Sequence, residues 1–173
     1  MPDTAEARTT YDLLIDLLAR GGATYRLIEH EPEGVTALAS AARGHDLEQA
    51  AKCIVVRVKL GKRTNRFILA VVPGDRLVAL DVLREMWGGT YVSFATRETA
   101  EELSGCVSGT IIPFTFRPDL ELVVDSGLLR QPEIYFNAAR LDVSVALDTR
   151  DYVRIAEPRV ESIARPAELA EAS

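Results

Sequence analysis

Ala51-Lys52-Cys53-Ile54-Val55-Val56-Arg57-Val58-Lys59 is the stretch that decides how the rest of this chain can fold. It predicts a β-strand, because four of its residues are β-branched and neither Gly nor Pro interrupts it. Side chains alternate between the faces of a strand, so Lys52 shares a face with the apolar residues Ile54, Val56 and Val58. The charges of Arg57 and Lys59 mark the other face as outward, which leaves Lys52 on the inward face. A buried ammonium is costly without an anion or polar pocket, so Lys52 either belongs to a site or reaches solvent from the strand end.

The length and composition are those of one globular domain. The chain has 173 residues, of which 47% are hydrophobic and 27% are charged. We expect a single domain over residues 1–173, with its core at 24–156, an N-terminal helix at 5–20 and a tail at 157–173 that is ordered only in part. No apolar run could span a bilayer and no signal peptide is found, so we expect a cytoplasmic protein without a membrane partner.

The charge pattern restricts the partners further. The net charge of −6 excludes a uniformly basic surface for nucleic acid, and no DNA partner is expected. A local basic cluster remains, because the segment 57–66 contains five basic residues and no acid: Arg57, Lys59, Lys62, Arg63 and Arg66. It predicts either a solvated hairpin tip or a contact for a phosphate backbone. Cys53 and Cys106 are too few for a disulfide framework, and no Cys/His spacing of a metal site occurs.

Short strands alternate with short helices along the chain. We expect helices at 5–20, 36–42, 81–87 and 96–103, a helical turn or short helix at 148–153, and strands at 24–28, 51–59, 66–72, 91–94, 120–124, 133–137 and 143–147. The strands at 51–59 and 66–72 form a hairpin that turns at Gly61-Lys62. This order favours an α+β fold with a mixed or barrel-like sheet flanked by helices over a doubly wound parallel sheet.

Common catalytic motifs are absent from the sequence. It contains no phosphate-binding P-loop, no dinucleotide-binding glycine fingerprint and no serine nucleophile elbow. Two histidines, His30 and His45, are too few for a His-based metal site, and their spacing does not support a catalytic triad. His30 lies in a loop, where it can be a site residue or an ordinary surface residue.

The segment Gly105–Phe114 is the most informative loop. It contains two glycines and a proline, and glycine lets main-chain N–H groups approach a ligand closely. Such amides can hold a carbonyl or carboxyl oxygen, although the segment can also be a plain connection between a helix and a strand. Asp125 ends a strand, where a carboxylate can form a turn or hold a substrate amine.

Five pieces of sequence occur in an order that resembles one family. They are Ala51-Lys52-Cys53-Ile54-Val55, Val72-Pro73-Gly74-Asp75, Gly105-x3-Gly109-x3-Pro113-Phe114, Val124-Asp125 and Phe136-Asn137-Ala138. Together they resemble the YbaK/prolyl-tRNA synthetase-associated domain family of aminoacyl-tRNA editing proteins, over about residues 25–155. The YeaK-like branch is the most similar, on further matches at His30-Glu31, Arg43-Gly44, Leu103-x-Gly105-Cys106-Val107, Pro113-Phe114-x-Phe116 and Asp151-Tyr152.

The resemblance implies a fold and an activity. The fold is a barrel-like mixed sheet flanked by helices, without a metal or organic cofactor. The activity is free-standing hydrolysis of the ester between a wrong amino acid and its tRNA, with seryl and threonyl groups associated with the YeaK-like branch and alanine or cysteine on proline tRNA with other branches. An aminoacyl-tRNA synthetase is a possible further partner. The alternative is a non-catalytic module of the same fold that binds tRNA or a synthetase.

The resemblance also assigns residues. Lys52 matches the essential lysine, and its charge would meet the phosphate or ribose at the 3′ CCA end. The substrate-binding set is Gly105, Ser108, Gly109, Pro113, Phe114, Asp125 and His30, and weaker tRNA contacts are expected at Lys62, Arg63 and Arg66. The loop amides would stabilise the ester oxyanion, and a ribose hydroxyl with a positioned water would replace a side-chain base. Ala139 and Thr115 depart from the family pattern, which has glycine and a small residue there, so the size of the pocket stays open.

Overall fold

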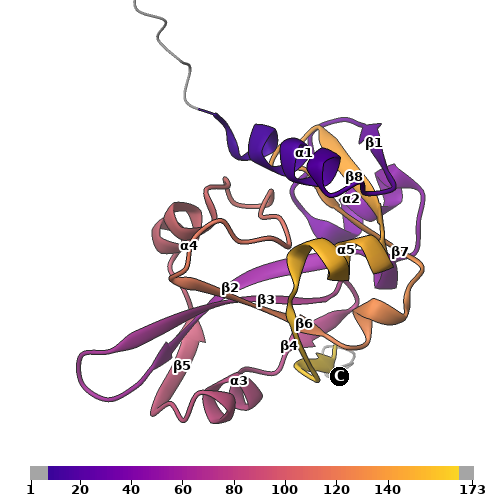
Figure 1. Cartoon of the computed structure of the whole chain (residues 1–173). Coiled ribbons are helices and arrows are strands. Elements are labelled where there is room, and N and C mark those ends of the chain that lie inside the picture. The colour runs from indigo at the N-terminus through magenta and orange to yellow at the C-terminus, as the bar shows by residue number, and fades with distance from the viewer. Residues whose placement is uncertain (1–7, 168–173) are drawn as a thin grey trace, which may run out of the picture.

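The computed structural model describes residues 8–167 and is built from short helices and strands (Figure 1). In chain order the elements are α1 (Thr10–Arg20), β1 (Tyr25–Glu29), α2 (Thr36–Arg43), η1 (Leu47–Gln49), β2 (Ala51–Lys59), β3 (Asn65–Pro73), β4 (Arg76–Val78), α3 (Leu80–Met86), β5 (Tyr91–Phe94), α4 (Arg97–Ser104), β6 (Leu120–Asp125), η2 (Leu128–Arg130), β7 (Glu133–Asn137), β8 (Val143–Asp148), α5 (Thr149–Ala156), β9 (Arg159–Glu161) and β10 (Ala164–Pro166). The predicted hairpin, helices and strands at 24–156 are present within one or two residues, except that α5 continues to Ala156. None of the helices within 8–167 is long and apolar enough to cross a membrane.

The strands form three sheets. The largest has the order β5-β2-β3-β6-β9, and it is mixed because β2 pairs antiparallel with β3 and β5 while β6 pairs parallel with β3 and β9. A three-stranded antiparallel sheet has the order β1-β8-β7, and β10 pairs with β4. The α+β class with a mixed sheet and flanking helices is confirmed. A barrel-like closure is not confirmed.

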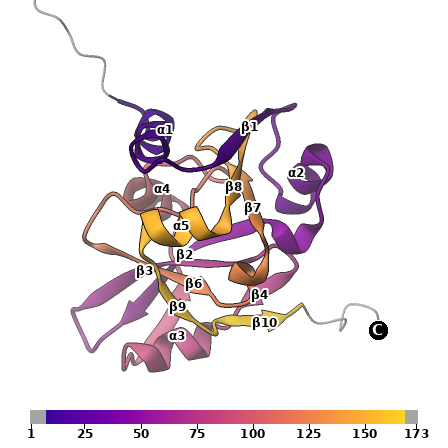
Figure 2. The ribbon, with the colours of Figure 1, turned by 45° about the vertical axis from the view of Figure 1, so that its right-hand side comes forward.

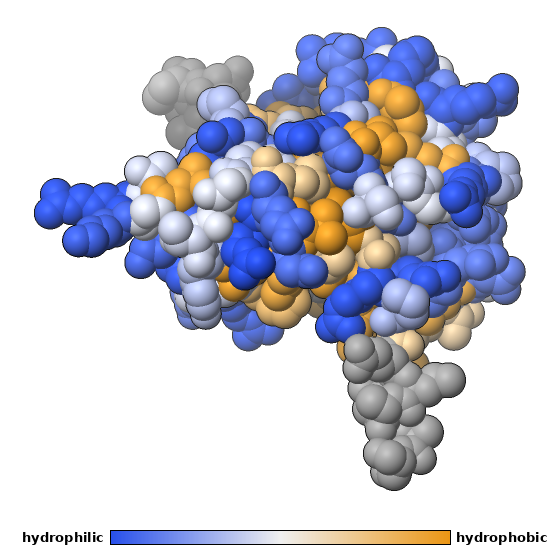
Figure 3. Space-filling view, turned by 90° about the horizontal axis from the view of Figure 1, so that it is seen from below, coloured by the Kyte–Doolittle hydropathy of each residue, from blue (hydrophilic) through white to orange (hydrophobic). Residues whose placement is uncertain are grey.

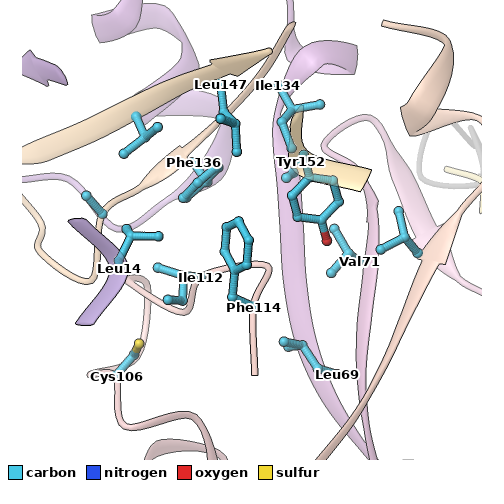
Figure 4. Packing of buried hydrophobic residues seen from close by; sticks show 14 of the residues in the cluster. Leu14, Leu69, Val71, Cys106, Ile112, Phe114, Ile134, Phe136, Leu147 and Tyr152 are labelled. Atoms are coloured by element: carbon cyan, nitrogen blue, oxygen red, sulfur yellow. The ribbon is translucent and has the colours of Figure 1, made fainter. Parts of the chain in front are cut away.

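The main core fills the space between the two larger sheets. One face of β2 and β3 contributes Val55, Leu69 and Val71, and α1, α5 and the segment 106–114 cover it (Figures 1, 2 and 4). Phe114 is central, because its ring contacts Phe136 and Tyr152 edge-on at centroid distances of 6.2 and 5.2 Å. The loop that follows α4 therefore contributes a core residue, which fixes where its glycines lie.

Both faces of β2 are covered, so the expectation that the face of Arg57 and Lys59, which also carries Cys53 and Val55, points outward is wrong. Val55 is 3% exposed and packs in the main core with Cys53 at its margin. Val56 and Val58 pack on the opposite face in a second cluster with Leu83 of α3. The charges at the end of β2 mark the half of the hairpin that projects beyond the body, rather than one face of the strand (Figure 1). In space-filling view from the α3 side, the hairpin end projects as a hydrophilic knob (Figure 3).

The two ends of the described chain differ from the expectation. The N-terminal helix begins at Thr10, because Thr9 and Asp12 form a capping box there; residues 5–7 of the predicted helix lie outside the described part. The expected tail instead forms β9 and β10, and Ile163 between them is fully buried. Strand β9 pairs with β6 and β10 pairs with β4, and this pairing orders the segment. Strands of three residues that depend on distant partners carry no recognisable strand pattern in the local sequence.

Candidate functional site

A cavity of about 350 Å³ opens at the free edge of β2. Strand β5 pairs with β2 only from Val56 onward, and its last contact is the Ala95 amide donating to the Val55 carbonyl at 2.9 Å. The edge of residues 51–55 is left to the cavity. The described lining residues come from five parts of the chain: Gly34, Thr36, Ala39, Arg43, Ala51, Lys52, Cys53, Ile54, Val55, Phe94, Ala95, Arg97, Ala100, Ser108, Gly109, Ile111, Phe136 and Asn137.

The charge of this lining has one sign. Arg43, Lys52 and Arg97 line the cavity, and no Asp or Glu does so among the described residues. Cations that converge without a carboxylate favour an anionic ligand, because a partly buried charge needs a counter-charge. The cavity is therefore suited to a phosphate-bearing or carboxylate-bearing molecule.

Lys52 lines the cavity and has a half-buried side chain. Its ammonium donates a hydrogen bond to the Arg76 carbonyl of β4, which leaves two of its three donors for a ligand. Burial lowers the pKa of Lys52 from its ordinary value, and the charge of Asp75 partly opposes that effect. Lysine at this position is thus partly desolvated and held in place by the Arg76 carbonyl.

Arg43 is a cation that the protein does not neutralise. Its guanidinium donates to His45 Nε2 at 2.9 Å, Ser144 Oγ at 3.1 Å and Ser40 Oγ at 3.2 Å, all of them neutral acceptors. No carboxylate forms an ion pair with it within residues 8–167. Burial lowers the pKa of Arg43 to about 10, so it keeps its charge at neutral pH. These bonds fix the guanidinium plane while its charge stays available to a ligand.

Asn137 joins the two loops that border the cavity. Its amide nitrogen donates to the Glu33 carbonyl at 2.8 Å and to the Gly109 carbonyl at 2.9 Å. The loops touch closely: Gly109 has φ +88°, and a Cβ there would lie 2.9 Å from the Gly34 Cα. Glycine is required at 109 for both reasons, and Asn137 holds the loop at that approach.

Two residues of the 105–113 loop that line the cavity have main-chain amides available to a ligand. The N–H groups of Gly105, Cys106, Ser108 and Thr110 are bonded to Glu101, Ser104, Glu101 and Val107. Within the described part of the chain, the N–H groups of Gly109 and Ile111 have no partner, and both residues line the cavity. Unpaired amides at a cavity wall can stabilise negative charge on a carbonyl oxygen.

Only some of the predicted substrate-binding residues line the cavity. Ser108 and Gly109 line the same cavity as Lys52, whereas Gly105, Pro113 and Phe114 lie behind it. Gly105 has φ +70° and ends α4, and the Pro113 carbonyl accepts from the Tyr152 hydroxyl at 2.7 Å. His30 does not line the cavity, but its Nε2 lies 2.7 Å from Ser144 Oγ, which contacts Arg43.

Asp125 does not line the cavity that Lys52 lines, but its own cavity is also lined by Arg76, whose carbonyl accepts from the Lys52 ammonium. Asp125 is 6% exposed and lines a separate cavity with Asp75 and Arg130. Its Oδ1 accepts from the Ile163 and Ala164 amides at 2.9 and 3.0 Å, and its Oδ2 accepts from the Gly127 amide at 2.9 Å. The carboxylate is occupied by the backbone and joins β6 to the segment between β9 and β10.

The basic hairpin lies apart from the cavity. Lys62 and Arg63 are exposed at its tip, and neither forms an ion pair within residues 8–167. Arg66 pairs with Glu121 of β6 through Nη2 at 2.6 Å, so its charge is already matched. Only Lys62 and Arg63 of the predicted contacts are left free for a phosphate backbone.

The two departures from the family pattern have different positions. Ala139 has φ +61°, the backbone conformation that favours glycine, in keeping with the glycine that the family resemblance implies at this place. Its neighbour Ala138 is buried, and Ala139 does not line the cavity. Thr115 lies in another surface hollow with Trp87 and Arg117, so it does not set the size of the cavity.

Sequence reasoning missed Arg43, Asn137, Arg97 and Ile111 as cavity residues. Arg43 ends a helix and Asn137 ends a strand, positions where polar residues are common and carry no special signal. The one available signal was that both belong to the pieces that resemble the editing family.

Comparisons with known proteins agree with this fold. A family model described as the aminoacyl-tRNA editing domain matches residues 30–155. The Escherichia coli (strain K12) protein named multifunctional Ser/Thr-tRNA deacylase ProXp-y is 42% identical over 168 residues, which cover 96% of this chain and 100% of that protein. A structure described as a candidate trans-editing enzyme for prolyl-tRNA synthetase has a TM-score of 0.73 and 20% identity, covering 92% of this chain and 99% of that one. A hypothetical protein of known structure has a TM-score of 0.78 and 24% identity, covering 88% and 99%. The chain therefore belongs to the aminoacyl-tRNA editing domain family, as its sequence motifs indicate.

Proposed function

We propose that this chain is a free-standing deacylase that hydrolyses the ester between a wrong amino acid and its tRNA. The observation that carries the proposal is the cavity at the edge of β2, where cations without a carboxylate partner lie beside two unpaired amides. An aminoacyl-tRNA terminus has the matching chemistry, because it carries phosphates next to an ester carbonyl. Seryl and threonyl esters are favoured over alanyl and cysteinyl esters, since the 42% identical relative is named for them.

The cavity residues suggest a division of work. Lys52 and Arg43 hold the terminal phosphate and ribose, so that the ester carbonyl lies at the Gly109 and Ile111 amides. Those amides stabilise the oxyanion that forms when water attacks the carbonyl carbon. No side chain of the cavity is placed as a general base, so the terminal ribose hydroxyl orients the attacking water. Lys52 positions and polarises the substrate and is not a covalent nucleophile, because an ester offers no carbonyl suited to a Schiff base.

The wider interaction is part of the same proposal. Lys62 and Arg63 contact the acceptor stem from the hairpin tip, whereas Asp125 supports the fold and does not touch the substrate. An aminoacyl-tRNA synthetase is a further partner, and the cytoplasm is the compartment in which aminoacyl-tRNA is used. Residues 1–173 act as one editing unit.

A panel of esters tests the function. The purified chain is incubated with Ser-, Thr-, Ala- and Cys-tRNA, and loss of each ester is compared with the protein-free rate. We expect rapid loss of the seryl and threonyl groups. If no ester is lost while tRNA still binds, the chain is a binding module and not a deacylase.

A further inference from the structure

A row of hydrogen bonds links His30 to the loop that borders the cavity, and it has no assigned role in the proposed chemistry. His30 Nε2 lies 2.7 Å from Ser144 Oγ, and Ser144 Oγ lies 2.9 Å from Asn137 Oδ1. The Asn137 amide nitrogen in turn donates to the Gly109 carbonyl at 2.9 Å. Ser144 is fully buried and Asn137 is 7% exposed. Through these contacts His30, which does not line the cavity, is connected to the loop that carries the Gly109 amide.

The strand order places these side chains in a row. Ser144 of β8 pairs with Asn137 of β7 on one side and with Ile28 of β1 on the other. Residues directly opposite each other on neighbouring strands point to the same face of a sheet. His30 follows Ile28 by two residues, and its amide continues the ladder by donating to the Asp142 carbonyl at 3.0 Å. His30 therefore shares the face of Ser144 and Asn137.

The orientation of the Asn137 amide follows from the groups around it. Its nitrogen faces the carbonyls of Glu33 and Gly109, which can only accept, so both of its hydrogens are used there. Its oxygen must then face Ser144 and accept the hydroxyl proton of that residue. A second donor, Arg43 Nη1, lies farther away at 3.5 Å. The Ser144 proton is therefore the short contact that fixes the oxygen end of this amide.

The charge of His30 decides whether Ser144 can supply that proton. His30 Nδ1 lies 2.8 Å from the Glu31 carbonyl, which can only accept, so Nδ1 carries a hydrogen. In a neutral ring Nε2 is then bare and competes with Asn137 for the single hydroxyl proton of Ser144. In a protonated ring Nε2 donates to Ser144, whose own proton goes to Asn137. Every contact in the row is satisfied only when His30 is protonated.

Charged groups of both signs lie near the His30 ring. On neighbouring segments they are Arg43, Arg140 and Asp142, and on its own segment they are Glu29 and Glu31. Arg43 donates to the same Ser144 hydroxyl at 3.1 Å and opposes a charge on the ring. Asp142 favours that charge: a hydrogen bond from Arg140 and, to a smaller extent, the charge of His30 lower the pKa of Asp142. Histidine is the side chain that changes its charge between pH 5 and 8, so pH is the variable that tests the row.

We propose that His30 and Ser144 are positioning residues, which hold Asn137 and the Gly109 loop so that the loop amides face the ester carbonyl. The inference rests on the proposed function, because the position of the loop matters only if the Gly109 and Ile111 amides stabilise the oxyanion. Neither His30 nor Ser144 lines the cavity, so the effect is on the chemical step rather than on binding. The protonated His30 ring is the state that holds the loop.

Ser144→Ala tests the row in deacylation of Ser-tRNA, because alanine removes the proton and little volume. At pH 5.5 it should lower kcat about fivefold, the factor that one hydrogen bond contributes, and leave KM within about twofold. Ser162→Ala is the matched control, because Ser162 is exposed between β9 and β10 and does not line the cavity, and it should keep the wild-type kcat. A raised KM with unchanged kcat for Ser144→Ala would place Ser144 in binding and overturn the positioning role.

The pH profile separates positioning from a purely structural role. The ratio of wild-type to Ser144→Ala kcat is followed from pH 5.5 to 8, since the ratio cancels the pH dependence of the ester itself. It should fall from about five toward one, because the neutral His30 ring draws the Ser144 proton away from Asn137. The ratio of His30→Gln to Ser144→Ala should stay at about five, because the glutamine amide nitrogen can lie where Nε2 lies and donates at any pH. A wild-type ratio that does not change with pH would overturn the proposal.

Nuclear magnetic resonance of the chain tests the same row without hydrolysis. The side-chain NH2 of Asn137 and the N–H of Gly109 should shift with the same midpoint as the His30 ring, and this step should be absent in His30→Gln. The neutral ring should carry its hydrogen on Nδ1, as read from its nitrogen shifts. Signals that do not follow His30, or a hydrogen on Nε2, would overturn the positioning role. Coupled signals in a chain that cleaves no ester of the tRNA panel would instead overturn only the deacylase.

Discussion

Arg43 shows at the scale of one residue how the fold maintains a charge for a ligand. Its guanidinium is held by His45, Ser144 and Ser40, which supply acceptors but no negative charge. A folded protein keeps such a partly buried cation at a cost to stability, unless a ligand supplies the anion. The arrangement makes an anion the natural occupant of the cavity beside Lys52.

Replacing this charge tests that reading. Arg43→Gln should raise KM for Ser-tRNA and flatten the slope of log KM against log salt concentration by about 0.7, the contribution of one phosphate contact to a single strand. Arg150→Gln is the matched control, because the Arg150 side chain is 93% exposed and remote from the cavity lining. A raised KM with an unchanged slope would mean that Arg43 only supports the structure.

His45 gives a prediction for pH. Its ring stacks on Tyr135 with 3.8 Å between centroids, and the Arg43 bond requires an unprotonated Nε2. Burial, with a smaller contribution from the charge of Arg43, lowers the pKa of His45 below its ordinary value. The unfolded chain therefore takes up the proton first, so this part of the stability is complete above about pH 6.5 and is lost as the pH falls toward the folded pKa.

Thermal unfolding checks the prediction between pH 7.5 and 5.5. The wild type should lose more Tm over this range than His45→Gln does, and His30 is common to both chains. Parallel curves for the two proteins would show that His45 does not titrate in this way.

At the scale of elements, Asp125 joins the end of β6 to the last two strands. Its carboxylate accepts three amides, from Gly127, Ile163 and Ala164. Asp125→Ala should lower the free energy of unfolding by about 3 kcal/mol, or roughly 6–12 °C in Tm, because buried amides lose a charged acceptor. Asp119→Ala, which removes an exposed ion pair with Arg117, should shift Tm by about 2 °C or less.

Activity distinguishes the two roles open to Asp125. At a temperature where the variant is folded, kcat/KM for Ser-tRNA should stay within about threefold of the wild type. A loss of activity without a loss of stability would show that Asp125 acts on the substrate, as the family resemblance implies.

Most elements were predictable because their signals are local. The β-branched run of β2, the turn at Gly61 and the caps of the helices are each written within a few residues. The side of β2 that faces the core was not predictable, since α3 covers the face opposite the main core and both faces are apolar. Strands β9 and β10 depend on distant partners, so composition alone suggested a tail.

The site was predictable in part for the same reason. Lys52, Ser108 and Gly109 were found from a strand pattern and a glycine loop, and they line one cavity. Arg43 and Asn137 reach that cavity from α2 and β7. These elements lie beside β2 only in the folded chain, so the local sequence does not indicate that the three meet. Asp125 lines a different cavity and binds backbone amides, and a carboxylate at a strand end looks the same in sequence whether it binds a ligand or the backbone.

At the scale of the whole molecule, the two larger sheets and the 105–113 loop meet at the free edge of β2. The main core holds that loop through Phe114, and the hairpin carries Lys62 and Arg63 away from the body (Figures 1 and 4). Strand β2 thus borders the cavity with its first half and enters the projecting hairpin with its second half. In the proposed function, deacylation depends on the cavity, and the hairpin adds affinity for tRNA that salt weakens.

Single-turnover hydrolysis of Ser-tRNA by Lys52→Ala is the most direct test of the central claim. The ammonium is half-buried and touches no part of the main core, so the variant should keep its Tm within a few degrees, as checked by circular dichroism. Its deacylation rate should fall at least about a hundredfold, the loss typical of removing one preorganised group that stabilises charge. Arg150→Ala, a remote surface control, should keep the wild-type rate. Hydrolysis by folded Lys52→Ala at the wild-type rate would contradict the account.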